Sequence, residues 1–187
     1  MIIGVLAVQG AFAEHEKKLS SLAINSIELR QKSDVLKSYD AIIFPGGEST
    51  VQGKLLKELD MFNTLKEQIK EGMPVLATCA GMILLAENIS NDSSKYFGTL
   101  PVTVKRNAYG RQLGSFHIIN DFAGTGKIPM TFIRAPYVES AAPEVKILAK
   151  VNDNIVAVQY GRQIALSFHP ELDMDLSVYN LFISSLK

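Results

Sequence analysis

Short aliphatic runs alternate with amphipathic segments through the first half of this chain. The runs at 2–8, 41–44 and 74–77 contain no polar side chain, which is typical of strands covered on both faces of a parallel sheet. Segments such as 11–22 and 62–71 instead suit amphipathic helices. Strands that alternate with helices favour right-handed crossovers, so we expect an α/β fold with a largely parallel central sheet and helices on both faces.

Smaller elements complete this half. We expect a strand at 26–29, a helical turn at 33–37 and a helix from Ser49 to about Leu59, where Ser49 and Gln52 have capping-box spacing. The carboxyl ends of the parallel strands would meet at one edge of the sheet, which is where open α/β folds bind ligands.

The pattern changes after about Ser90. Short runs broken by turns predict antiparallel additions to the sheet, and an amphipathic helix is expected at about 176–186. The expected strands lie at 102–104, 113–119, 132–133, 145–151, 155–160 and 164–168. With 187 residues, 47% of them hydrophobic, we expect residues 1–187 to form a single domain.

Charge balance and cysteine content restrict the partners and the compartment. Nineteen basic residues balance nineteen acidic ones, so no net field would draw the chain to nucleic acid or to an anionic membrane. A single cysteine cannot form an intramolecular disulfide, which fits a reducing compartment. No apolar run approaches the length of a membrane span, and the opening run is too short for a signal sequence. We therefore expect a cytoplasmic protein.

The only cysteine, Cys79, stands between the apolar run at 74–77 and an apolar helix. Ala77 and Gly81 flank it two residues away on each side, which is the spacing of small residues in a strand-turn-helix nucleophile elbow. There the thiol would lie near the N–H groups of a helix N-terminus, which favour the reactive thiolate. The alternative is a structural cysteine buried at a strand end, and the segment alone leaves both open.

A Pro-Gly-Gly sequence at 45–47 follows the third expected strand. Adjacent glycines let backbone N–H groups approach a ligand closely, although an ordinary strand-to-helix turn explains the same residues. The loop lacks the lysine of a phosphate-binding P-loop. Together with Gln9-Gly10 and Cys79, it would lie at the carboxyl edge of the sheet, so that three loops face one crevice.

The last expected strand leads into His169-Pro170-Glu171. Because proline restricts the residue before it, His169 is expected in an extended setting, with Glu171 able to reach behind the imidazole. A cysteine nucleophile needs such a base, and the base works better when a carboxylate orients it. The alternatives are a simple turn and a metal site, the latter disfavoured because no further ligand cluster accompanies the pair.

Two arginines and two histidines complete the candidates. Arg134 follows an apolar strand, where a buried guanidinium would need an anion, either a substrate carboxylate or an acidic side chain. Arg106 raises the same question less sharply, because solvent alone could satisfy it. His15 and His117 have no neighbours in the sequence that suggest more than surface or packing roles.

The segments around Cys79, 45–47 and His169 together resemble the class I glutamine amidotransferases. Longer stretches resemble the glutaminase subunits of pyridoxal 5′-phosphate synthase, from the first strand to the last helix. These stretches are 4–10 with Glu14-His15, 45–50, 106–112, 132–136 and 169–172.

The resemblance implies a flavodoxin-like fold and a glutaminase. Cys79 would attack the carboxamide of L-glutamine to form a thioester, His169 would act as base and then as acid, and Glu171 would orient His169. The N–H groups of Gly47 and Ala80 would form the oxyanion hole. By the family pattern, the residues that hold glutamine would be Gly47, Glu48, Ser49, Arg106, Ile133 and Arg134. No metal and no cofactor are expected.

A partner is expected as well. Ammonia released into neutral water becomes ammonium, which is not a nucleophile, so a glutaminase with no acceptor site of its own needs a sheltered receiver. The resemblance implies that the receiver is a (β/α)₈-barrel synthase subunit, within a large hetero-oligomer that makes pyridoxal 5′-phosphate (vitamin B6). The candidate interface residues are Gln9, Gly10, Glu14 and His15.

Two other functions fit the same residues less well. A stand-alone cysteine peptidase or γ-glutamyl hydrolase would use the elbow without any partner. A catalytically silent binding module would keep the fold alone, but the presence of Cys79, His169 and Glu171 argues against it.

Overall fold

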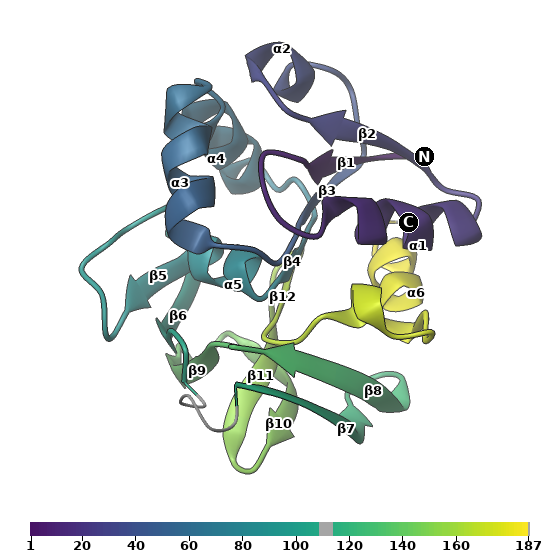
Figure 1. The fold of residues 1–187 in the computed structure, drawn as a ribbon, viewed down its shortest axis with the longest axis vertical. Coiled ribbons are helices and arrows are strands. Elements are labelled where there is room, and N and C mark those ends of the chain that lie inside the picture. The colour runs from purple at the N-terminus through teal and green to yellow at the C-terminus, as the bar shows by residue number, and fades with distance from the viewer. Residues whose placement is uncertain (109–113, 187) are drawn as a thin grey trace.

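The computed structural model describes residues 1–108 and 114–186, and within them a ten-stranded sheet forms the centre of the molecule (Figure 1). Its strands are β1 (Ile2–Leu6), β2 (Asn25–Leu29), β3 (Ala41–Phe44), β4 (Val75–Thr78), β5 (Ala86–Ile89), β6 (Leu100–Lys105), β9 (Tyr137–Ala141), β10 (Lys146–Val151), β11 (Asn154–Tyr160) and β12 (Gln163–Leu166). They lie in the order β2-β1-β3-β4-β12-β11-β9-β6-β5, with β10 paired to β11.

The helices follow the expected alternation with the first strands. They are α1 (Phe12–Ser21), α2 (Lys32–Val35), α3 (Ser49–Glu58), α4 (Phe62–Lys70), α5 (Ala80–Leu85), the short 3₁₀ helix η1 (Pro170–Leu172) and α6 (Ser177–Ser184). No helix in the described ranges is long and apolar enough to cross a membrane.

Strands β2, β1, β3, β4 and β12 are parallel neighbours, which confirms the predicted parallel half. Every residue of β3, β4 and β12 is buried, as their aliphatic sequences require. Two hydrophobic cores account for this burial. One packs α3, α4 and α5 on one face of the sheet, and the other packs α1 and α6 on the opposite face (Figure 1).

The second half adds antiparallel strands, as predicted, since β11 pairs with β12; β9, which was not among the expected strands, pairs with both β11 and β6. One part of that prediction is wrong. Strands β7 (Ser115–Phe122) and β8 (Gly126–Ile133) form a separate two-stranded sheet. Its Phe122 and Phe132 pack on Phe168, with ring centroids 6.2 and 5.7 Å away. This packing places the end of β8 beside the loop that follows β12.

Several expected boundaries and caps also differ from the structure. The expected strand at 132–133 is only the end of β8, and residue 113 of the strand expected at 113–119 lies outside the described residues, as do 109–112 of the stretch 106–112. The capping box expected at the start of α3 is absent: Glu48 is the N-cap residue, and it makes no side-chain cap hydrogen bond. The Gln52 amide instead donates to the carbonyl oxygens of Gln9 and Pro45.

Candidate active site

Cys79 lies in the turn between β4 and α5, in the predicted strand-turn-helix arrangement. Its backbone has φ 47° and ψ −101°, a conformation that non-glycine residues rarely adopt and that costs about 1–3 kcal/mol. The Cys79 N–H donates to the Leu166 carbonyl oxygen at 2.8 Å, which ties the turn to β12. A Cβ atom on Gly81 would lie 2.4 Å from the Phe44 carbonyl oxygen, so only glycine lets α5 pack this closely against β3.

His169 and Glu171 are paired behind this turn. The Nδ1 of His169 lies 2.7 Å from Oε1 of Glu171, and the two residues are only 7% and 4% exposed. Burial raises the pKa of Glu171, but the hydrogen bond and positive charge of the neighbouring His169 help to hold it below its ordinary value. An ionised carboxylate only accepts hydrogen bonds, so Nδ1 of His169 donates.

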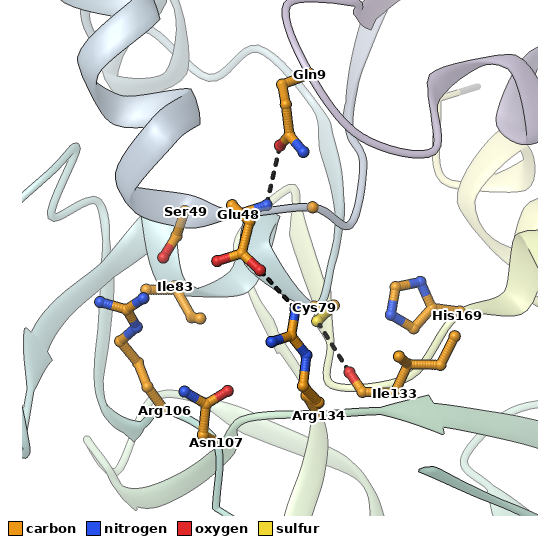
Figure 2. A pocket seen from close by; sticks show the side chains of 11 residues that line it. Gln9, Glu48, Ser49, Cys79, Ile83, Arg106, Asn107, Ile133, Arg134 and His169 are labelled. Carbon is orange, nitrogen blue, oxygen red and sulfur yellow. Dashed lines mark hydrogen bonds and ion pairs between the residues drawn. The ribbon is translucent and has the colours of Figure 1, made fainter. Parts of the chain in front are cut away.

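The charge on His169 is favoured despite its burial. Burial lowers the pKa of His169, but the facing side chains of Cys79 and Glu171 outweigh burial and raise that pKa to about 10. The Nε2 atom has no hydrogen-bond partner among the described residues, and Figure 2 shows the imidazole ring beside Cys79. The imidazolium form therefore dominates at neutral pH, with Nε2 available on the side of the thiol.

The glycine loop lies against both of these side chains. A Cβ atom on Gly46 would lie 2.3 Å from Cε1 of His169 and 3.4 Å from Cβ of Cys79. The Gly46 N–H donates to Oγ1 of Thr78 at 2.9 Å, and its carbonyl oxygen accepts from the N–H of Ala11 at 3.0 Å. Because the next peptide bond is trans and planar, the N–H of Gly47 points away from Ala11.

A cavity of about 240 Å³ opens beside Cys79, and all six residues expected to hold a substrate line it (Figure 2). Its lining consists of Gln9, Gly47, Glu48, Ser49, Cys79, Ile83, Arg106, Asn107, Ile133, Arg134 and His169. Glu171 stands behind His169 instead, and Ala80 is fully buried as the first residue of α5.

Two lining residues, Ile83 and Asn107, were not expected there. Gln9 was expected to face this crevice, because its place after the first strand belongs to the carboxyl edge of the sheet. Its side-chain oxygen accepts from the N–H of Glu48 at 2.9 Å, so Gln9 holds the glycine loop. The sequence carried no comparable signal for Ile83 or Asn107.

Both arginines have protein carboxylates as partners. The Arg134 side chain is 69% exposed, so the expectation of a buried guanidinium is wrong. Its NH2 lies 2.6 Å from Oε1 of Glu48 across the cavity mouth. Arg106 is more enclosed, with a 17% exposed side chain and NH1 at 2.5 Å from Oδ2 of Asp92. The cavity therefore presents an acidic and a basic group side by side.

His15 does not lie where it was expected. It is fully buried, with Nε2 at 3.2 Å from Oγ1 of Thr78 and 3.5 Å from Oε2 of Glu171. A buried side chain cannot contact a partner, so the interface expectation for His15 is wrong, and so is a role in packing alone. Gly10 is exposed and Glu14 is partly exposed.

The arrangement suits acyl transfer by a thiol nucleophile. A strained turn presents Cys79 to a cavity, a charged imidazole with a carboxylate behind it faces the sulfur, and backbone N–H groups of a glycine loop and a helix start lie close by. The described residues include no group of three or more His, Cys, Asp or Glu side chains arranged to hold a metal ion.

Comparison with known proteins now identifies the family. The family model for the SNO glutamine amidotransferase family matches residues 5–187. The chain belongs to this family. Membership confirms the resemblance drawn from the motifs and establishes the chain as a glutamine amidotransferase.

Individual members of the SNO family are similar over their whole length. The pyridoxal 5′-phosphate synthase subunit PdxT of Desulfitobacterium hafniense (strain DSM 10664 / DCB-2) is 61% identical over 186 residues, which cover 100% of this chain and 94% of the relative. The protein of the same name from Haemophilus influenzae (strain PittEE) is 51% identical over 190 residues, which cover 100% and 99%.

The fold of this chain is also found in solved structures. A crystal structure described as a glutamine amidotransferase matches with a TM-score of 0.94 and 38% sequence identity, covering 100% of this chain and 99% of that chain. The predicted fold class, with a largely parallel sheet, helices on both faces and antiparallel strands in the second half, is confirmed.

Proposed function

We propose that residues 1–187 form one glutaminase domain, which hydrolyses L-glutamine to L-glutamate and ammonia as a subunit of a pyridoxal 5′-phosphate synthase. The relatives support this role, because they are named as subunits of pyridoxal 5′-phosphate synthase. The observation that carries the proposal is that the Cys79 turn, the His169–Glu171 pair and the Gly46-Gly47 loop converge on one cavity.

Cys79 is the proposed nucleophile. Its proton already resides on His169 as the imidazolium, so the thiolate sulfur bonds to the carboxamide carbon of glutamine and the carbonyl oxygen becomes an oxyanion. The N–H groups of Gly47 and Ala80 stabilise that oxyanion. The carbon–nitrogen bond then breaks as His169 donates its proton, and ammonia leaves a thioester on Cys79.

Water completes the reaction. With His169 now neutral, its Nε2 takes a proton from a water molecule, whose oxygen attacks the thioester carbon. The carbon–sulfur bond breaks, Cys79 is regenerated and glutamate leaves. The Glu171 carboxylate holds the imidazole in one orientation through both steps and stabilises its charged form.

The polar lining of the cavity matches a free amino acid. Glutamine carries an ammonium group and a carboxylate on its α-carbon, and the Glu48–Arg134 pair with Arg106 offers both complementary charges. Ser49 supports this assignment, because its buried Oγ has no hydrogen-bond partner among the described residues although the residue lines the cavity. A substrate that bonds to this hydroxyl would satisfy it.

The proposed receiver of the ammonia is a (β/α)₈-barrel synthase subunit in a large hetero-oligomer. Gln9, Gly10 and Glu14 remain the proposed interface residues, at the turn before α1 and on its first turn. The single cysteine, Cys79, has a free thiol, and we propose the cytoplasm as the compartment because thiols stay reduced there.

The experiment that tests this function measures glutamate release from L-glutamine by the wild type and by Cys79→Ala, each with and without the synthase subunit. We expect release that needs both Cys79 and the synthase. Release without the synthase would favour the free cysteine hydrolase, and no release in any mixture would favour the silent binding module.

A further inference from the structure

His15 lies at the centre of a buried chain of polar contacts that ends at His169. Its Nδ1 lies 2.8 Å from the hydroxyl of Tyr179 on α6, and its Nε2 faces Thr78 and Glu171. Glu171 in turn bonds to Nδ1 of His169 at 2.7 Å. Residues from α1, β4, η1 and α6 thus meet around one imidazole behind the cavity.

The His15 ring is neutral in this setting. Burial lowers the pKa of His15, and the nearby His169 lowers it further, against the opposing effect of the Glu171 and Glu14 carboxylates. A neutral imidazole has one N–H donor and one acceptor nitrogen, so the surroundings must select the tautomer.

The partners of the ring select the tautomer with hydrogen on Nε2. Glu171 is ionised and can only accept, so the atom that faces it must carry the hydrogen. Burial raises the pKa of Tyr179, which therefore keeps its proton and can donate to Nδ1. The Nε2–H then donates to Oγ1 of Thr78 at 3.2 Å and directs its positive end toward Oε2 of Glu171 at 3.5 Å.

This contact matters because Oε2 of Glu171 has no hydrogen-bond partner among the described residues. The Nε2–H of His15 is therefore the positive group that faces this otherwise unsatisfied buried oxygen. Thr78, the other partner of His15, accepts a hydrogen bond from the N–H of Gly46 at 2.9 Å. One ring nitrogen thus touches both the carboxylate behind His169 and the residue that anchors the glycine loop.

We infer that His15 is a positioning residue of this site, whose neutral ring orients Glu171 and Thr78 through Nε2–H while Tyr179 fixes its tautomer. This inference deepens the proposed function and rests on it, because it concerns how the partner of the proposed base is held. Residues that orient the imidazole and carboxylate ligands of metal sites contribute about ten- to a hundredfold to activity, and we expect an effect of the same size here.

The first test reads the tautomer directly. The chain has three histidines, so a long-range ¹H–¹⁵N spectrum of the ¹⁵N-labelled protein shows three rings, assigned with His15→Gln and His117→Gln. We expect His15 to be neutral at pH 7, with the hydrogen on Nε2, and Tyr179→Phe to weaken that preference. A charged His15 ring, or one with hydrogen on Nδ1, would overturn the inference without any measurement of turnover.

The second test uses glutaminase kinetics in the presence of the synthase subunit. His15→Phe fills the same space without polar atoms, and we expect kcat to fall about ten- to a hundredfold with KM unchanged. His15→Gln places an amide N–H near the position of Nε2 and should restore part of kcat. An unchanged kcat in folded His15→Phe, or an effect on KM alone, would contradict a positioning role.

Matched controls separate this role from a general loss of buried polar groups. Tyr39→Phe removes another buried hydroxyl, which bonds to Gln68 at 2.7 Å away from the cavity, and should leave kcat unchanged where Tyr179→Phe lowers it. His117→Gln is the corresponding control for His15→Gln, and it should also leave kcat unchanged.

The two tests also distinguish this inference from the proposed function. If Cys79→Ala abolishes glutaminase activity while the His15 ring carries its hydrogen on Nδ1, only the role of His15 is refuted. If Cys79→Ala keeps its activity, both the proposed function and the role of His15 in it are refuted.

Discussion

Gly46 fills a narrow space in the site, between the His169 ring and the Cys79 side chain. Its backbone is not in the left-handed region, so an alanine there would be limited by contacts and not by φ. The added methyl group would lie 2.3 Å from Cε1 and 2.8 Å from Nδ1 of His169. Gly46→Ala therefore tests how far the imidazole can move before the reaction fails.

We expect Gly46→Ala to lower kcat/KM for glutamine by about a hundredfold, because a displacement of about 1 Å in a reacting group has a cost of that size. Steady-state kinetics with the synthase subunit present measure the effect. Gly53→Ala on α3 is the matched control: its methyl group is equally crowded, but by the Tyr96 ring, and it should keep full activity. Full activity in Gly46→Ala would show that the ring is not fixed.

The role of His15 shows what sequence reasoning can reach at this scale. Cys79, His169 and Glu171 could be identified from the sequence because each lies in a short motif whose neighbouring residues indicate its chemistry. His15 did not, because its partners Thr78 and Tyr179 are 63 and 164 residues away in the chain. The pairing of Arg134 with Glu48 was hidden for the same reason, since 86 residues separate them.

At the scale of elements, the distance between α5 and β3 determines where the thiol stands. Gly81 faces the backbone of Phe44, and a Cβ atom there would lie 2.4 Å from the carbonyl oxygen and 2.9 Å from Cβ of Phe44. Backbone atoms of a buried central strand cannot swing aside as a side chain can. A larger residue must move the whole helix and, with it, Cys79.

Gly81→Ala should therefore lower both stability and activity. We expect a loss of about 1–3 kcal/mol in the free energy of unfolding, the usual cost of an overpacked core, together with lower kcat. Urea unfolding curves and glutaminase assays at the same temperature measure the two effects. Gly53→Ala, where the Tyr96 side chain can yield, should lose less stability and keep its activity, and equal losses in the two variants would contradict this account.

Prediction of elements from sequence succeeded where burial is uniform. β1, β3 and β4 have apolar sequences that only a strand covered on both faces explains. In the helices that follow them, apolar residues recur with the helical period of 3.6 residues. β8 was mostly missed because Gly126 and Pro129 interrupt its pattern, although a two-stranded edge tolerates proline. β5 follows α5 without a break, and no strand was expected there.

At the scale of the whole molecule, the histidines make folding depend on pH in two opposite directions. The pKa of His15 is below its ordinary value of 6.5 in the folded state, so the unfolded chain binds the extra proton as pH falls below 6.5 and stability is lost. The pKa of His169 is raised to about 10, so its contribution is complete below pH 6.5 and is lost as pH rises through 10.

We therefore expect the contributions of these two groups to the free energy of unfolding to be greatest near pH 6.5, the ordinary pKa of both rings. Urea titrations across the pH range measure the profile. His15→Gln should flatten its acidic side, and His169→Gln should flatten its alkaline side. If either variant kept the wild-type slope, the corresponding shift in pKa would be wrong.

The order of the strands has a consequence for synthesis on the ribosome. β12 lies between β4 and β11 at the middle of the sheet, yet it is the last strand among the described residues. A nascent chain thus exposes the open edge of β4 until residues 163–166 emerge, and open edges invite wrong pairing. The same order delays assembly of the site, because His169, Glu171 and Tyr179 follow β12, so the thiol gains its base only after β12 has been synthesised.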